Sequence, residues 1–362
     1  MPFNIIIVGA GLIGPRHAQT VQANPSTHLL ALIDPSPSAA QTAATLQTLY
    51  FPSLDALLAS PSIPRPDAAI VCTPNHTHIP LATTLLSNNI HVLLEKPISD
   101  DPSTARALLS TLTPTSPKLL IGHHRRFNPY ITATKQLLTT NALGPIIALN
   151  GLWTLYKPDT YFAPPGDWRR STETGGGVLA INLIHDIDLL HYLFGPITRV
   201  FAEQTAPTRP SPPHAAEEGA AITLRFASGV VGTFLVCDAT PSPWSFEAGT
   251  GENPLIPQVQ GEGAEGFYRI FGQRGSLSVP DMRRWSYEGR AERSWSEELV
   301  VERREVDRTS PTPFALQLAH FVEVIQGKVE PVCTGEEALR ALLVVEAIGR
   351  ALRTGQVVDV EG

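Results

Sequence analysis

The first third of the chain alternates short apolar runs with segments of helical periodicity. The apolar runs, which we expect to form strands, are residues 4–8, 29–34, 68–72, 91–94 and 118–122. The spacing of apolar residues between them predicts helices at residues 15–23, 38–49, 53–59, 79–87 and 102–112. Continuously apolar strands that alternate with helices are typical of a parallel sheet covered on both faces. Residues 1–122 therefore predict a doubly wound α/β domain of the Rossmann type.

The pattern changes after residue 122. A helix at 130–139 is followed by segments that read as strands, which are residues 146–155, 198–204, 220–226 and 230–238. Ser228-Gly229 is typical of a hairpin turn between the last two. Helices are predicted at residues 178–194, 314–325 and 336–352. We therefore expect residues 123–362 to form an α+β domain with a large, mostly antiparallel sheet, while the closing helices are able to pack back on the first domain.

The long loops and the amino-acid composition limit the classes of protein to which this sequence can belong. Residues 205–216 and 240–266 are rich in Pro and Gly, and loops of this length are usually lids or mobile surface. The chain has 362 residues, a net charge of −7 and no basic stripe, which argues against nucleic acid as a partner. The run at 5–8 is too short to span a membrane and has no basic residue before it. Three widely spaced cysteines are typical of a reducing compartment, so we expect a cytoplasmic protein without a membrane partner.

A glycine motif follows the first predicted strand, where residues 9–14 read GAGLIG. In this context Gly9 permits a tight turn, Gly11 lets the backbone approach a pyrophosphate, and Gly14 allows close packing of helix and strand. Asp34 ends the second strand, where a carboxylate accepts hydrogen bonds from ribose hydroxyls and repels a 2′-phosphate. The pattern predicts NAD rather than NADP as cofactor. The alternatives are a purely structural glycine turn and a solvated acid at the strand end.

Together with this motif, three further blocks make the sequence recognisable. Residues 73–78 read TPNHTH, residues 95–97 read EKP, and residues 175–188 begin with GGG and end with HDID. With these blocks the chain resembles the Gfo/Idh/MocA family of NAD(P)-dependent oxidoreductases over nearly its whole length, including a closing helix within residues 331–355.

The resemblance implies reversible hydride transfer between NAD(P) and a hydroxyl-bearing carbon of a small polyol, sugar, cyclitol or hydroxy acid. It implies that Lys96 is the catalytic lysine, which holds and polarises the substrate oxygen, and that its bond to Pro97 is commonly cis. His185 would exchange the proton, with Asp186 or Asp188 orienting its imidazole. The residues expected to bind the cofactor are Gly9, Gly11, Leu12, Ile13, Gly14, Asp34, Thr73, Pro74, Asn75, His78, Glu95, Lys96 and Pro97.

Cations and aromatic side chains suited to a small hydroxylated substrate occur in the second predicted domain and at the domain junction. The candidate substrate-binding residues are Arg125, Lys157, Tyr161, Trp168, Arg169, Asn182 and His185. The alternative is ordinary packing of an aromatic-rich loop, and the Trp168-Arg169 pair can instead lie against the cofactor. His76 and His78 lack a matching cluster of acids or cysteines, so we expect no metal site.

One position departs from the family pattern. Many members carry an aspartate four residues before the histidine, where this chain has Ile181, whose side chain cannot accept a proton. Either Asn182, Asp186 or Asp188 takes over the polar role, or Lys96 and His185 act alone. The glycines at 175–177 would leave room for a ligand at the start of the next helix; a flexible loop before a buried helix is the alternative. Ile181 also leaves open a catalytically lapsed NAD(P)-binding regulator or sensor.

We also expect this protein to assemble. An antiparallel sheet with one face covered by helices has a second face to bury. Alternating apolar residues within 220–236 are interpreted as that second face. The family commonly pairs through such a sheet, so the resemblance implies a homodimer or homotetramer.

Overall fold

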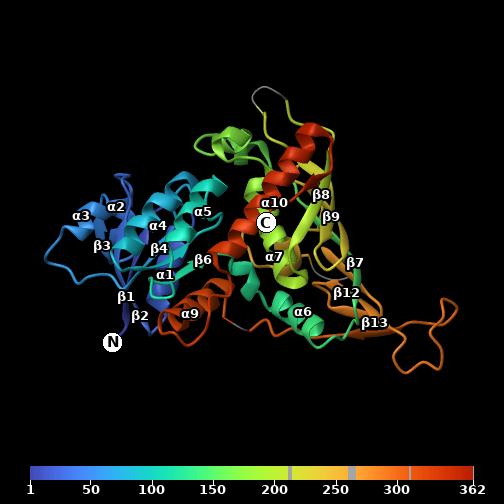
Figure 1. Ribbon diagram of the computed structural model, residues 1–362. Coiled ribbons are helices and arrows are strands. Elements are labelled where there is room, and N and C mark those ends of the chain that lie inside the picture. Colours follow the sequence, from blue (N-terminus) through green and yellow to red (C-terminus); the bar gives the residue numbers. More distant parts are fainter. Residues whose placement is uncertain (211–213, 260–265, 310, 362) are drawn as a thin grey trace. The chain divides into compact units, whose positions relative to one another are not determined.

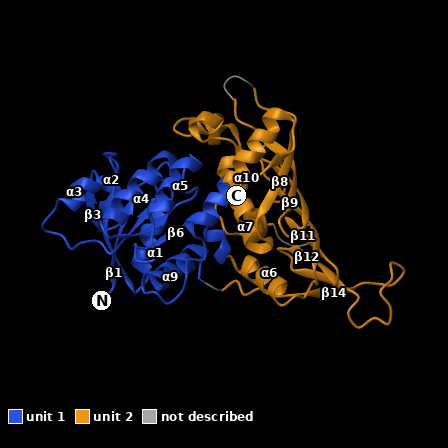
Figure 2. Cartoon of the chain, viewed as in Figure 1, with its two compact units in different colours: residues 1–127, 311–342 blue, residues 128–310, 343–362 orange. Residues whose placement is uncertain are grey.

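The computed structural model describes residues 1–210, 214–259, 266–309 and 311–361. The chain divides into two compact units (Figure 2). Unit 1 comprises residues 1–127 and 311–342, and unit 2 comprises residues 128–310 and 343–362. The last helix, α10 (Gly335–Thr354), contributes its first residues to unit 1 and the remainder to unit 2.

Unit 1 is built on a six-stranded parallel sheet with the order β3-β2-β1-β4-β5-β6. Its strands are β1 (Phe3–Val8), β2 (Thr27–Ile33), β3 (Leu49–Phe51), β4 (Ala68–Val71), β5 (His91–Leu94) and β6 (Leu119–Ile121). Its helices include α1 (Gly14–Ala23), α2 (Ala39–Thr45), α3 (Leu54–Leu58), α4 (His78–Ser87), α5 (Pro102–Thr111) and α9 (Pro313–Ile325). Every residue of β4 is buried, as expected for a strand covered on both faces. The doubly wound parallel sheet is confirmed.

The strand order changes direction at the centre of this sheet. From β1 the chain crosses to β2 on one side, whereas from β4 it crosses to β5 on the other side. Because such crossovers are right-handed, α1 and α4 must lie on opposite faces of the sheet, as Figure 1 shows. The segments that follow β1 and β4 therefore separate at this switch point. Open parallel sheets bind their ligands in the crevice that results.

One predicted helix extends too far. The pattern predicts helix at residues 38–49, but α2 ends at Thr45, and Leu49 pairs with Ala31 at the start of edge strand β3. Gln47 has a left-handed φ of 51°, which ends the helical path. Pairing with β2 decides this segment, because a three-residue strand carries too little periodicity to be recognised alone.

Unit 2 is built on a nine-stranded sheet with the order β14-β13-β12-β11-β7-β10-β9-β8-β15. The strands are β7 (Ile146–Thr154), β8 (Ile197–Gln204), β9 (Gly219–Phe226), β10 (Val231–Cys237), β11 (Tyr268–Gly272), β12 (Gly275–Val279), β13 (Arg283–Ser286), β14 (Val300–Arg303) and β15 (Val358–Asp359). β7 and β10 pair in parallel, and the other neighbouring pairs are antiparallel. This confirms the mostly antiparallel sheet, including the predicted hairpin between β9 and β10.

The helices of unit 2 include one irregular element. Besides the later part of α10, its α-helices include α6 (Pro129–Thr139), α7 (Ile184–Phe194) and α8 (Phe246–Thr250), and α7 lies alongside the sheet (Figure 1). The predicted helix at 178–194 is interrupted, because Leu179–Leu183 forms a π-helical turn before α7. The stretch Thr172–Phe194 is long and apolar enough to cross a membrane, but 67% of its apolar window is buried in the protein. Of the two long loops, residues 211–213 and 260–265 lie outside the described residues.

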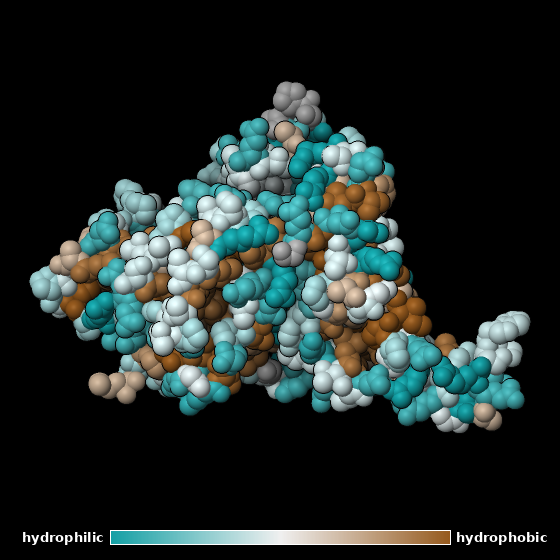
Figure 3. Space-filling model, viewed as in Figure 1, coloured by the Kyte–Doolittle hydropathy of each residue, from teal (hydrophilic) through white to brown (hydrophobic). Residues whose placement is uncertain are grey.

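The apolar alternation along β9 and β10 lies on the covered face of the sheet. Ala220, Ile222, Leu224 and Phe234 are each at most 3% exposed in the single chain. Our interpretation of this alternation as a face awaiting a partner is therefore wrong, because its apolar side chains already form the core of unit 2. The outer face has a mixed character, and Val231, which is 47% exposed, is one of the apolar residues that reach the surface there. Figure 3 shows apolar patches scattered among hydrophilic residues on the surface that it displays.

Candidate active site

The glycine loop between β1 and α1 has the geometry that its sequence predicts. Gly9 has a φ of 103°, and a Cβ there would lie 2.7 Å from the carbonyl oxygen of Cys72. A Cβ at Gly14 would lie 2.0 Å from the carbonyl oxygen of Gly9, so α1 starts close against the loop. A Cβ at Gly11 would meet no described atom within 4 Å, and Leu12 is 81% exposed. The outer side of the loop is thus open at the start of a helix, which suits a pyrophosphate.

Asp34 is tied to this loop through its carboxylate. Its Oδ2 accepts a hydrogen bond from the backbone N–H of Ala10 at 2.7 Å, and its Oδ1 accepts one from Ser36 at 2.8 Å. A carboxylate has about four acceptor positions, so capacity for ribose hydroxyls remains. Binding of ribose by Asp34 stays a prediction.

The turn after β4 carries the Thr73–His78 block, and its residues differ in accessibility. Pro74 is exposed and Asn75 is half-buried, so a ligand can reach both. His78 is buried, with Nδ1 2.7 Å from the carbonyl oxygen of Pro97 and Nε2 2.9 Å from that of Thr73. Burial lowers the pKa of His78. Its ring therefore links the turns after β4 and β5, and it lies behind the residues that we expect to line the cofactor.

Glu95 and Lys96 follow β5, on the other side of β4 from the glycine loop. The Glu95 carboxylate is buried, with Oε1 2.8 Å from Nε2 of His17 on α1, and its Oε2 accepts from the backbone N–H of Lys96 at 3.2 Å. Burial alone would raise the pKa of Glu95, but the hydrogen bond and charge of His17, then His124 and Lys96, lower it to about 2. Lys96 itself is partly exposed, and its bond to Pro97 is cis. Sequence reasoning missed His17, whose only signal is its position three residues after Gly14.

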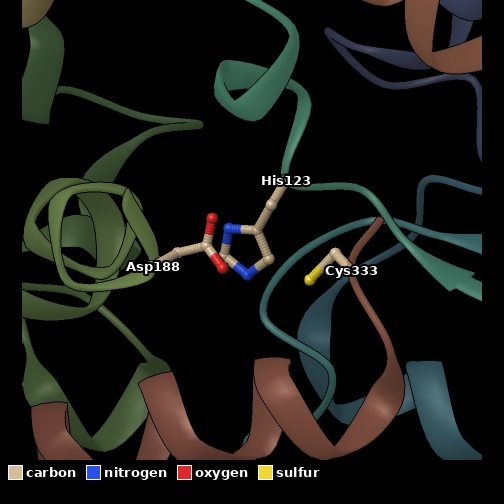
Figure 4. A group of neighbouring side chains, drawn as sticks. All are labelled: His123, Asp188 and Cys333. Atoms are coloured by element: carbon tan, nitrogen blue, oxygen red, sulfur yellow. The ribbon is translucent and has the colours of Figure 1, made fainter. Parts of the chain in front are cut away.

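The segment after β6 places the predicted Arg125 in a buried setting. Arg125 lies in the short helix His124–Phe127 and is 5% exposed. Just before it, His123 neighbours Cys333, with a ring nitrogen and the Sγ within 4.8 Å of each other (Figure 4). The backbone N–H of Ile121 donates to the carbonyl oxygen of Cys333 at 3.2 Å, which attaches this segment to the start of α10. A role for Arg125 in substrate binding stays a prediction.

In unit 2 the structure brings three predicted substrate residues together around one ammonium group. Lys157 is 7% exposed, and its Nζ donates to Oδ1 of Asn182 at 2.6 Å. The same Nζ lies 3.2 Å from Oδ2 of Asp238 and 4.7 Å from the centroid of the Tyr161 ring. Burial lowers the pKa of Lys157, and the charge of Asp238 opposes that effect. Asp238 was not predicted as a site residue.

The Trp168-Arg169 pair stacks beside this group. The guanidinium of Arg169 lies 4.2 Å from the centroid of Tyr161 and 5.1 Å from that of Trp168. It also donates to the carbonyl oxygen of Tyr161 at 2.9 Å. Trp168 remains 41% exposed, which leaves its ring accessible to a ligand.

The start of the helical segment before α7 is filled by the protein itself. Glu217 accepts a hydrogen bond from the backbone N–H of Leu179 at 3.0 Å. Gly177 has a φ of 93°, and a Cβ there would lie 2.2 Å from Oε1 of Glu217. The expectation that the glycines leave room for a ligand at this position is therefore wrong at Gly177. Its missing side chain makes room for a capping carboxylate, whose pKa is raised by burial.

The structure also places the residues around the predicted catalytic histidine. His185 lies in the first turn of α7 and is 7% exposed. Asp186 is fully buried, and its Oδ1 accepts a hydrogen bond from the hydroxyl of Tyr268 in β11. Asp188, one of the side chains labelled in Figure 4, is 1% exposed. Of the groups proposed to replace the acid absent at Ile181, Asn182 is thus held by a cation and Asp186 by a phenol.

Comparison with known proteins identifies the family. The model of the oxidoreductase family NAD-binding Rossmann fold matches residues 3–123, and that of the oxidoreductase family C-terminal alpha/beta domain matches residues 135–360. The chain belongs to the Gfo/Idh/MocA oxidoreductase family. This Gfo/Idh/MocA protein is therefore an NAD(P)-dependent oxidoreductase, with a Rossmann domain that binds a nicotinamide dinucleotide.

Individual relatives of this oxidoreductase share a modest part of its sequence. Inositol 2-dehydrogenase of Rhizobium meliloti is 32% identical over 189 residues, which make up 52% of this chain and 54% of that protein. The chain thus aligns with about half the length of this relative. The scyllo-inositol 2-dehydrogenase (NAD(+)) of Bacillus subtilis is 23% identical over 98% of this chain and 95% of its own length. The WlbA dehydrogenase from Bordetella pertussis, solved with NADH and UDP-GlcNAcA, matches all of both chains with a TM-score of 0.76 and 23% identity.

Proposed function

We propose that this oxidoreductase transfers a hydride reversibly between NAD and a hydroxyl-bearing carbon of a small polyol, sugar, cyclitol or hydroxy acid. The observation that carries the proposal is the placement of Lys96. It follows the strand next to the switch point of the sheet, on a turn held by the buried Glu95 carboxylate. The relatives named as inositol dehydrogenases support a hydroxylated substrate for the same reaction class.

The proposal assigns a distinct role to each catalytic residue. Bound NAD would accept or return the hydride, and the open glycine loop and Asp34 would hold it. The ammonium group of Lys96 donates a hydrogen bond to the substrate oxygen and stabilises the negative charge that develops there. The imidazole of His185 exchanges the hydroxyl proton, which must leave the oxygen as the carbonyl forms.

The experiment that tests this function is a substrate screen followed by substitution of Lys96. Absorbance of the reduced nicotinamide would be followed with sugars, inositols, quinate and shikimate. Lys96→Ala should lower turnover by roughly 10²–10⁴-fold, as is typical for losing a positioned proton-transfer group, while nucleotide affinity stays nearly unchanged. Lys328→Ala, at an exposed site, is the matched control.

Two outcomes would contradict the proposal. Full turnover in Lys96→Ala would remove the assigned mechanism. A wild-type protein that binds NAD but turns over no substrate would favour the lapsed regulator.

We further propose NAD rather than NADP as the preferred cofactor. The Asp34 carboxylate lies at the end of β2 beside the glycine loop, where it would repel a 2′-phosphate. Fluorescence titration of both reduced cofactors should show tighter binding of NADH. Asp34→Ala should weaken NADH binding more than NADPH binding; tighter NADPH binding by the wild type would overturn the preference.

We also propose a cytoplasmic homodimer or homotetramer. Among the described residues, Cys72, Cys237 and Cys333 form no disulfide, which suits a reducing compartment. The outer face of the unit 2 sheet has a hollow of about 540 Å³ whose lining includes Phe201, Val231 and Phe271, and this surface is our candidate interface.

A further inference from the structure

A series of buried polar contacts in unit 2 ends at Asn182. Arg209 donates to Oδ1 of Asp238 at 2.6 Å and to its carbonyl oxygen at 2.7 Å. The other carboxylate oxygen of Asp238 lies 3.2 Å from Nζ of Lys157, and this Nζ donates to Oδ1 of Asn182 at 2.6 Å. Asp238 is 3% exposed and Lys157 is 7% exposed, so water screens these contacts poorly.

This series of contacts determines which way the Asn182 amide points. An ammonium group only donates hydrogen bonds, so the amide atom that faces Lys157 must be the oxygen. The amide nitrogen of Asn182 must then point away from Lys157. Within the described part of the chain it donates to no residue, and Asn182 keeps part of its surface exposed. The arrangement leaves the N–H₂ group of Asn182 available to an acceptor that is not part of the described protein.

We propose that Asn182 is a specificity-determining residue whose amide N–H₂ donates a hydrogen bond to an oxygen of the substrate, and that Lys157 and Asp238 are positioning residues for that amide. This inference rests on the proposed function. The proposed function assigns Lys96 and His185 to the hydroxyl that is oxidised, so Asn182 is assigned to a different oxygen of the substrate. Asn182 thereby supplies a polar contact beside Ile181, whose own side chain can make none.

The proposal has a consequence for substrate choice. A site built to hydrogen-bond one oxygen discriminates against the analogue that lacks it, because a desolvated donor is then left without an acceptor. The substrate should therefore carry a hydroxyl, carbonyl or carboxylate oxygen besides the reacting hydroxyl. A substrate analogue that lacks this oxygen should have a lower kcat/KM than the substrate.

The test uses single-deoxy analogues of the best substrate from the screen. For the wild type, one analogue should show a kcat/KM at least about 10-fold below that of the parent. Asn182→Ala should lower kcat/KM for the parent to the level of that analogue and remove the difference between the two. Lys157→Met should have the same effect, and the double variant should lose no more than either single variant, because the two residues act as a unit.

Two further variants keep the result interpretable. Asn182→Asp retains an oxygen for Lys157 but removes the donor, so it should fold and still lose the discrimination. Asn150→Ala, on β7, removes an asparagine bonded to Thr233 and should leave discrimination intact. Affinity for NADH should be unchanged in every variant.

Two results would overturn this inference while leaving the proposed function in place. One is that Asn182→Ala still shows the wild-type difference in kcat/KM between the parent substrate and the deoxy analogue. The other is that the kcat/KM losses of the two single variants multiply in the double variant. A wild type without turnover would overturn the proposed function and this inference together. Full turnover in Lys96→Ala would overturn the mechanism alone.

Discussion

Glu95 is a buried carboxylate whose charge is balanced within unit 1. Its neighbours His17, His124 and Lys96 hold its pKa at about 2, against 4.5 for an unperturbed glutamate. A carboxyl group with a lowered pKa in the folded state stabilises the fold above its unfolded pKa. That stability is lost as pH falls through the folded pKa. The carboxylate also accepts from the Lys96 backbone, so its charge state bears on the turn that carries the proposed catalytic lysine.

We therefore predict a pH-dependent difference between the wild type and Glu95→Gln. The stability of the wild type relative to Glu95→Gln should be about 3 kcal/mol greater above pH 4.5 than near pH 2. Urea unfolding at a series of pH values measures it. Glu323→Gln, at an exposed site on α9, should show no comparable pH dependence. A constant difference between wild type and Glu95→Gln would contradict the prediction.

The segment from Gly177 to the end of α7 shows how an element is shaped by its surroundings. The sequence reads as one helix, but it begins with a π-helical turn at Leu179–Leu183 whose start is capped by Glu217. π-Helical turns are rare and often occur at functional sites. Here the turn carries Asn182, the residue held by Lys157.

We predict that Gly177→Ala lowers the free energy of unfolding by about 2 kcal/mol or more. The alanine would have to adopt a φ of 93° and would place its Cβ 2.2 Å from the Glu217 carboxylate. Gly289→Ala is the matched control, since Gly289 has a φ of 79° but open space around it, so only the backbone cost of about 1 kcal/mol applies. Urea unfolding of both variants gives the difference. Equal losses would show that the contact with Glu217 is easily relieved.

For the whole molecule, the outer face of the nine-stranded sheet is the surface at which we expect assembly. Val231 is 47% exposed and Phe271 is 42% exposed, and both line the hollow on that face. Burying such side chains against a second copy would stabilise an oligomer by the hydrophobic effect. Light scattering at micromolar concentration should give the mass of a dimer or tetramer.

Val231→Asp should shift this mass to that of the monomer, because it would bury a carboxylate in the interface. Trp295→Asp, at a 96% exposed residue outside the hollow, should leave the mass unchanged. A wild-type monomer, or an oligomer that tolerates Val231→Asp, would contradict this interface.

The sequence by itself determined the features that depend on residues close to one another along the chain. Apart from the edge strand β3, the strands of unit 1, the glycine loop and the β9–β10 hairpin follow from local patterns, because apolar periodicity and backbone conformation act over a few residues. The segment from β11 to β14 escaped prediction, since short strands become recognisable only when paired with one another and with β7.

Only the tertiary structure decided which distant side chains meet. His17 reaches Glu95 across 78 positions of sequence, Lys157 reaches Asn182 across 25, and Glu217 meets Leu179 across 38. The same holds for the alternation in β9 and β10, whose apolar side proved to be the core of the unit rather than a free face. Periodicity shows that one side of a strand is to be buried, but what covers that side depends on how the whole chain packs.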